Sequence, residues 1–243
     1  MIRRATSAEE LSRLPEHGVE AQKIRALLLA YGTKYDFCRF FVSEDFILCE
    51  MNGSFVVSEI GEYPDVEELA DFFGFGGFSE IFCSDVLGKR LAERLEGREC
   101  ETVSLMKFCG SVSETETRGE TNRPPRLDNV YVILKTAFDI DYEAWYTDMS
   151  HRIRHNVASA RLLGRSALMI QYDQNGEALL SQIATAPEAR GQGNASKLIR
   201  EVCAELYPDD VYVICEDDLV GFYNKLGFKI VRHNSIIKNT SNP

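Results

Sequence analysis

The feature that most constrains the fold of this chain is a strand, a glycine loop and a helix that follow one another between Ala178 and Ile199. An apolar run of β character ends near Pro187, and the loop Arg190-Gly191-Gln192-Gly193-Asn194-Ala195 follows it. From Ala195 onward, apolar residues recur at i, i+3, i+4, i+7, i+8 and i+11. This recurrence predicts a helix that lies on a core. The order strand, loop, helix indicates an α/β fold.

The loop has the composition of an anion site. A helix that begins in a glycine-rich loop presents unpaired backbone N–H groups and the positive end of its dipole, so it attracts phosphate. Gly191 and Gly193 allow the backbone to approach an anion closely, and the small Ala195 leaves the first turn open. The spacing is neither that of a P-loop, because no Gly-Lys-Ser/Thr follows, nor Gly-x-Gly-x-x-Gly. Taken by itself, the loop fits a diphosphate cradle and an ordinary capped turn equally well.

A second motif follows in the same half of the chain. The run VYVIC at 211–215 predicts a buried strand, and a short helix with Phe222, Tyr223 and Leu226 then precedes Gly227 and the strand-like FKIV. Together, RGQGNA and FYNKLGF resemble the motifs of the GNAT superfamily of N-acetyltransferases. The first is similar to its Arg/Gln-x-x-Gly-x-Gly/Ala signature for the acyl-CoA diphosphate, and the second to its closing Phe-Tyr-x-x-x-Gly-Phe segment. The resemblance covers roughly residues 129–238.

The resemblance implies acetyl-CoA as cosubstrate and an amine as acceptor. Backbone amides would hold the diphosphate at Arg190, Gly191, Gln192, Gly193, Asn194, Ala195 and Ser196. The backbone of Ile183, Ala184 and Thr185 would pair with the pantetheine arm, and one amide there would polarise the thioester carbonyl. Tyr223 would be the general acid that gives its proton to the coenzyme A sulfur, with a packing tyrosine as the alternative. Many relatives carry an asparagine where this chain has Glu216, so Glu216 is either a general base acting through water or a cause of weaker donor binding.

An acceptor pocket is expected beside a helix predicted over residues 141–155. Asp148, His151 and His155 share one face of that helix, and either a pocket wall or a solvated polar face fits them. The two histidines have the i, i+4 spacing of a metal pair, but arginines lie between them and no Glu follows the first, so we expect no metal. The candidates for a general base are Glu216, Asp148, His151 and Glu177, besides direct attack by an already neutral amine.

The N-terminal half predicts a similar series of elements. A helix is expected over 19–31, and three short strands within 37–60, with Asn52-Gly53 as a hairpin turn. A helix over 65–73 and strand, helix and strand over 81–109 follow. In the C-terminal half, residues 157–164, 166–173 and 176–185 predict three antiparallel strands, with Gln174-Asn175-Gly176 as the tight turn before the third. Because this half has the same order after its first helix, an internal repeat is indicated, with an unrelated α/β cap as the alternative. In place of RGQGNA the N-terminal half has Gly61-Glu62-Tyr63-Pro64-Asp65, so a degenerate copy would lack the diphosphate cradle.

Three segments are therefore expected. Residues 1–110 form a mixed α/β domain, and residues 111–128, with a Pro-Pro pair and almost no large apolar side chain, form a linker. Residues 129–243 form the GNAT-like catalytic domain, whose first strand is expected at 130–138. The expected fold class is α/β with a mixed sheet in each domain.

Charge and cysteine content restrict the partners. The net charge of −11 and pI near 5.0 leave no basic footprint for nucleic acid. The acidity suits a cationic amine acceptor, although solubility alone also accounts for it. Seven scattered cysteines without a CxxC pair, no signal peptide and no long apolar segment predict a cytoplasmic protein with reduced thiols and no membrane partner.

Two functions from different classes follow. The first is an N-acetyltransferase that moves an acetyl group from acetyl-CoA directly to a primary amine. The second is a catalytically inactive protein of the same fold that binds coenzyme A or acts as a scaffold. The intact RGQGNA and Tyr223 favour the enzyme, because a relic has no need of either.

Overall fold

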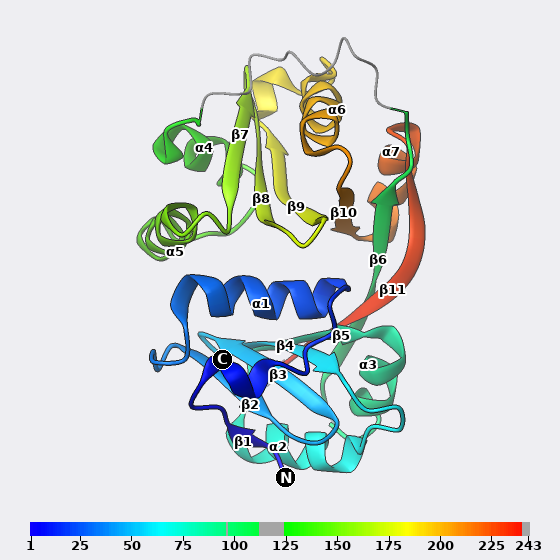
Figure 1. Cartoon of the computed structure of the whole chain (residues 1–243). Helices are drawn as coiled ribbons and strands as arrows, with labels where there is room; N and C mark the ends of the chain where they lie inside the picture. Colours follow the sequence, from blue (N-terminus) through cyan, green and yellow to red (C-terminus); the bar gives the residue numbers. More distant parts are fainter. Residues whose placement is uncertain (96, 112–123, 240–243) are drawn as a thin grey trace. The chain divides into compact units, whose positions relative to one another are not determined.

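The computed structural model describes residues 1–95, 97–111 and 124–239 (Figure 1). They form two compact units. The first comprises Met1–Ser104 and Arg232–Pro243, and the second comprises Leu105–Val231. These bounds differ from the expected segments, because the last strand of each half is divided between the units. Most of the expected linker, residues 112–123, lies outside the described residues, and a helix begins before its expected end.

The first unit is a mixed sheet with three helices and a short 3-10 turn among its described residues. Its elements are β1 (Arg3–Arg4), η1 (Ala8–Leu11), α1 (Val19–Tyr31), β2 (Cys38–Val42), β3 (Phe46–Met51), β4 (Ser54–Glu59), α2 (Val66–Gly76), β5 (Glu80–Ser84), α3 (Asp85–Ala92) and β6 (Glu99–Phe108). The strands β2, β3 and β4 are antiparallel, and β4 pairs with β5 in parallel. The predicted Asn52-Gly53 turn is confirmed, with both residues at positive φ.

The second unit repeats this plan. Its elements are α4 (Leu127–Leu134), α5 (Tyr142–Arg154), β7 (Ser159–Leu163), β8 (Ser166–Gln174), β9 (Glu177–Thr185), η4 (Pro187–Ala189), α6 (Asn194–Leu206), β10 (Asp210–Cys215), α7 (Asp217–Lys225) and β11 (Phe228–Lys238). Again three antiparallel strands lead to a parallel pair, here β9 with β10. The predicted internal repeat is thus confirmed, since β7 to β11 with α6 and α7 follow the order of β2 to β6 with α2 and α3.

Two cores lie on opposite faces of the second unit's sheet. On one face α4 and α5 bury Val130, Trp145 and Met149 against alternate residues of β8 and β9. On the other face α6 and α7 bury a larger set that includes Leu198 and Tyr223. Figure 1 shows α4 and α5 on one side of β7, β8 and β9 and α6 on the other. This division follows from the strand period of two, because neighbouring residues of β8 point to opposite faces.

Each unit takes in a strand from the other half of the chain. In the first unit the strand order is β1-β2-β3-β4-β5-β11-β6, and in the second it is β11-β6-β10-β9-β8-β7. The strand next to β5 is therefore β11, and the strand next to β10 is β6. Ile237 of β11 belongs to the first unit's core, and Met106 of β6 belongs to the second unit's core. Both side chains are fully buried. The exchange of β6 and β11 between the two halves of the chain therefore contributes to both cores.

One predicted element is wrong. Residues 130–138 were expected to form a strand because Val, Tyr and Ile dominate there, but Leu127–Leu134 is the helix α4. Its buried residues Val130, Ile133 and Leu134 recur at i, i+3 and i+4, which is the helical period. Packing on the sheet has overridden the β propensity of these residues. Within the described residues, no helix combines the length and apolarity required to cross a membrane.

Candidate functional site

The site of the second unit begins where β9 and β10 separate. The two strands pair in parallel from Glu177 with Asp210 to Leu180 with Val213. Within the described residues no pairing continues beyond this point, although β9 extends to Thr185 and β10 to Cys215. The backbone of Ile183, Ala184 and Thr185 therefore has no strand partner on the β10 side, and this free edge is where the pantetheine arm is expected. An extended ligand could add there as a strand.

The glycine loop lies at the end of the same strand. The 3-10 turn η4 leads to Arg190, and the side chain of Arg190 donates from Nε to the Thr185 carbonyl at 3.2 Å. Gly191 and Gly193 both have φ of +76°, a backbone conformation in which a residue with a side chain would be strained. A Cβ at either position would meet nothing within 4 Å, so the space in front of the loop is open.

The first turn of α6 is free to accept an anion. Gly193 is the N-cap residue and has no side chain with which to cap, and no acidic residue occupies the first turn. The N–H groups of Asn194, Ala195 and Ser196 therefore keep the unsatisfied donors and the positive helix end that phosphate prefers. Lys197 in that turn is two-thirds exposed and forms an ion pair with Glu201 at 3.7 Å, which offsets its charge. The residues Arg190 to Ser196 that the sequence assigned to the diphosphate thus fit it.

The matching loop of the first unit is filled by its own carboxylates. Asp65 caps α2 by accepting from the backbone of Glu67 and Glu68, and the carboxylate of Asp45 accepts from the backbone of Asp65 at 3.0 Å. Here, too, the parallel strands β4 and β5 pair only as far as Val56 and Phe82. Ser84 and Glu59 join the separated strands by a hydrogen bond of 2.5 Å. The acidic cap and this bridge occupy what the second unit leaves open.

Tyr223 lies on the buried face of α7. Its side chain is 5% exposed and packs edge-on against Phe222 and Phe228 at centroid distances of 5.1 and 5.6 Å. Burial, and secondarily the neighbouring Cys215 thiol, raise the pKa of the Tyr223 phenol well above its ordinary value. None of the described residues hydrogen-bonds its hydroxyl. The phenol is therefore protonated at neutral pH, and its O–H can donate a hydrogen bond to a ligand.

Glu216 is the N-cap residue of α7 and is exposed. It lies seven residues before Tyr223, which is roughly 10 Å along the helix axis. The structure therefore places the two catalytic candidates at different ends of the same helix. Glu177, another candidate base, is buried at the opposite end of β9, roughly 20 Å along the strand from Ile183. That distance removes Glu177 from the site.

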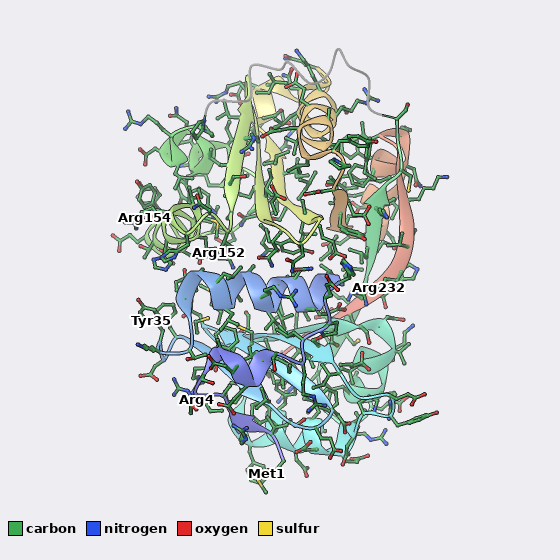
Figure 2. The ribbon with its side chains drawn as sticks, viewed as in Figure 1. Met1, Arg4, Tyr35, Arg152, Arg154 and Arg232 are labelled. Carbon is green, nitrogen blue, oxygen red and sulfur yellow. The ribbon has the colours of Figure 1, made fainter. Side chains whose placement is uncertain are left out.

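The acceptor-pocket candidates on α5 have partners that the sequence did not reveal. Asp148 and Arg152 form an ion pair with 3.1 Å between Oδ1 and Nε, and Arg152 is 5% exposed. Figure 2 labels Arg152 on α5. The rings of His151 and His155 stack with centroids 4.4 Å apart. In the part of the chain that the structure describes, no group of three or more His, Cys, Asp or Glu side chains could hold a metal ion. The Asp148 carboxylate is therefore engaged within α5 by the neighbouring turn of the same helix.

Sequence reasoning missed one contact at the free edge of β9. The indole N–H of Trp145 on α5 donates to the side-chain oxygen of Gln182 at 3.1 Å. Gln182 has a φ of +46° in the middle of the strand. The only hint in the sequence is that polar Gln182 interrupts an apolar run, which is too common a pattern to be diagnostic.

The comparisons with known proteins agree with this geometry. Residues 153–230 match the family model for an acetyltransferase (GNAT) domain. A solved structure of a Drosophila protein is 12% identical, covering 100% of this chain and 99% of its own, with a TM-score of 0.68. A GCN5-related N-acetyltransferase from Kribbella flavida is 12% identical, covering 98% of both chains, with a TM-score of 0.65. No curated protein matches the chain by sequence.

A third solved structure bears on the repeat. A tandem GNAT protein from the clavulanic acid biosynthesis pathway is 10% identical, covering 100% of this chain and 99% of its own, with a TM-score of 0.58. At such low identity the likeness establishes the fold. The fold is thus that of GNAT proteins. More particularly, residues 153–230 in the C-terminal half match the acetyltransferase (GNAT) domain model, and the N-terminal half has a related fold without the glycine loop.

Proposed function

We propose that the C-terminal half is an acetyl-CoA-dependent N-acetyltransferase that moves the acetyl group directly to a primary amine. One observation carries the proposal: an uncapped helix N-terminus, opened by Gly191 and Gly193, follows directly on the free edge of β9. A diphosphate at the loop and an extended arm along β9 would be held by main-chain groups alone. The acidic N-terminal half would contribute structure and no second donor site.

The transfer needs four contributions from the chain. The loop and β9 would hold the donor so that its carbonyl meets the amine, and a backbone N–H of β9 would stabilise the oxygen as negative charge develops. The amine nitrogen would form the new C–N bond while the C–S bond breaks, and the amine would lose a proton to a base. Tyr223 would supply a proton, or a strong hydrogen bond, to the departing sulfur.

Glu216 is the base that we propose, acting through water. It is exposed at the carboxyl end of β10, and the two carboxylates that follow it would attract a cationic acceptor. Attack by an amine that has already lost its proton needs no base and would leave Glu216 without a catalytic role. Replacing Glu216 by Gln distinguishes the two, since only the first mechanism loses the rising limb of the pH–rate profile.

Calorimetric titration with acetyl-CoA is the experiment that tests the proposal. We expect saturable binding that Gly193→Val abolishes, because Val is strained at φ of +76° and its side chain would enter the open space before α6. Gly176→Val is the matched control, since Gly176 has φ of +72° in the open turn at the far end of β9. This variant should bind normally despite the same backbone strain.

Desulfo-CoA and ATP separate the parts of the donor. Desulfo-CoA should bind, because it retains the diphosphate and the pantetheine arm, and ATP should bind weakly at best because it has no arm for β9. Absence of acetyl-CoA binding at millimolar concentration would exclude the transferase and favour the scaffold protein. If binding is established, a screen of small primary amines and peptide N-termini for thiol release identifies the acceptor class.

A further inference from the structure

We propose that Trp145 is a positioning residue: its hydrogen bond to Gln182 holds a bulge in β9 in the shape that aims a backbone N–H at the donor carbonyl. The inference rests on the proposed function. In that reaction a backbone N–H of β9 would polarise the thioester carbonyl, and Trp145 would orient that N–H. Three observations carry it, namely a strained backbone, a break in strand register and a partly buried side-chain contact, all within the second unit.

The strain is at Gln182. Four described residues other than glycine have positive φ: Asn52, Asn156, Asn175 and Gln182. The first three are asparagines in turns or at a helix end, where Asn tolerates this conformation. Gln182 is instead inside a strand and has no such tolerance. A conformation of this kind persists only where neighbouring structure enforces it, and it is frequent at functional sites.

The strand register shows that the strained residue lies in a β-bulge. On β8, Ala167 pairs with Ala184 and Met169 pairs with Ser181, so Gln182 and Ile183 together face the single residue Leu168. This is a β-bulge, which leaves backbone groups of the wider strand outside the ladder. On the other side, pairing with β10 ended at Leu180. The peptide groups around residues 182–183 are therefore released from both neighbours at the start of the free edge.

Trp145 has the properties of a rigid support. It is 7% exposed and packs in the core that α4 and α5 form on the sheet, together with Met149 and Ala184. Its indole has a single N–H, and that donor reaches the Gln182 side-chain oxygen at 3.1 Å. Gln182 and Ala184 point to the same face of β9, so the bond ties the bulge to the face that carries α5. Without it, Gln182 can relax toward ordinary extended φ and the freed amides turn away.

The chain supplies its own spectroscopic reporter, because Trp145 is its single tryptophan. In nitrogen-15-labelled protein the indole gives one N–H signal. We expect slow hydrogen exchange for that signal in the wild type and fast exchange, with a changed shift, in Gln182→Leu. Gln182→Glu should restore protection, since a carboxylate also accepts the bond. An indole signal that Gln182→Leu leaves unchanged would overturn the proposal without reference to any ligand.

The second measurement uses acetyl-CoA labelled with carbon-13 at the acetyl carbonyl. In the wild-type complex, infrared difference spectra should show the carbonyl band at lower frequency than in water, as expected for a strong hydrogen bond. Trp145→Phe keeps most of the packing and removes the N–H, so it should bind acetyl-CoA with unchanged affinity, lose the frequency shift, and transfer acetyl about tenfold more slowly. Gln182→Leu should do the same and covers the case in which Trp145→Phe fails to fold.

Thr136→Val is the matched control. It removes a 2.7 Å hydrogen bond from the Thr136 hydroxyl to the Ile133 carbonyl, just after the end of α4. It should leave the indole signal, the carbonyl shift and the transfer rate at wild-type values. Failure of the proposed function and failure of the positioning role are distinguishable. If the wild type does not bind acetyl-CoA, the proposed function is rejected, and this inference with it. Normal binding with a full carbonyl shift in both Trp145→Phe and Gln182→Leu rejects the positioning role alone.

Discussion

At the scale of single residues, Tyr223 is a buried phenol whose environment favours its neutral form. Desolvation penalises the phenolate, and a thiolate at Cys215 would repel it, so both effects raise the pKa. A group that must donate to a departing sulfur gains from being fully protonated. The Tyr223 role is therefore testable through pH as well as through mutation.

Replacing Tyr223 by Phe should lower kcat about a hundredfold with little change in acetyl-CoA affinity. Because the folded pKa lies above the ordinary value of 10.0, the wild-type rate should show no loss at pH 10 from ionisation of this phenol. The measurements are a pH–rate profile and donor titrations. Tyr212→Phe, which removes a hydroxyl from β10, is the control and should keep the wild-type rate. A Tyr223→Phe variant with full kcat would leave the residue as packing only.

Sequence alone was sufficient to place the glycine loop between a strand and a helix. The loop from Arg190 to Ser196 could be located because glycine spacing is written directly in the sequence. Gln182 could not be located, since its strained φ depends on a partner on α5 that is distant in sequence. For the same reason, the pairing of Asp148 with buried Arg152 became visible only in the fold.

At the scale of elements, two glycines in helices show how the surroundings decide whether Gly→Ala raises or lowers the free energy of unfolding. Gly88 lies in α3, where a Cβ would be 2.2 Å from the Ser235 Cβ of β11 and 3.3 Å from the Cys83 sulfur. Gly74 lies in α2, where a Cβ would meet nothing within 4 Å. Alanine favours a helix over glycine at both positions, by up to about 1 kcal/mol. Only at Gly88 does the added methyl group overlap another element.

Gly88→Ala should therefore destabilise the protein by about 1–3 kcal/mol, the usual cost of overpacking. Gly74→Ala should stabilise it by roughly 0.5 kcal/mol, because α2 gains helix propensity at an exposed position. Urea denaturation of the two variants and the wild type gives the free energies of unfolding. Equal effects at both positions would contradict the close packing of α3 on β11.

The element that sequence reasoning placed wrongly, α4, illustrates a local limit. Val130, Ile133 and Leu134 carry the helical period, but the segment is short and rich in β-branched and aromatic residues, so period and propensity disagree. The strands β7, β8 and β9 were predicted correctly because alternation and the Asn175-Gly176 turn agree there. Prediction succeeded where two local signals coincided.

At the scale of the whole molecule, the exchange of β6 and β11 joins two repeats that the sequence presents as consecutive. Strand pairing between distant segments leaves no local signature, so a division near residues 111–128 was the natural expectation. The structure gives each unit a core strand from the other half: Met106 of β6 with α6 and α7, and Ile237 of β11 with α2 and α3. Neither half of the sequence therefore contains all the strands of one unit.

Cleaving the folded protein once and expressing its two halves separately should thus have different consequences. A chain cleaved once within residues 112–123 keeps β6 and β11 in both cores, so it should retain a cooperative thermal transition and acetyl-CoA binding. Fragments 1–111 and 124–243 expressed separately each lack an inner strand and leave buried apolar residues uncovered, so neither should unfold cooperatively alone. Mixed from denaturant, they should restore both properties, as followed by circular dichroism and titration. A separate 124–243 fragment that folds and binds acetyl-CoA by itself would show that β6 is dispensable for the second unit.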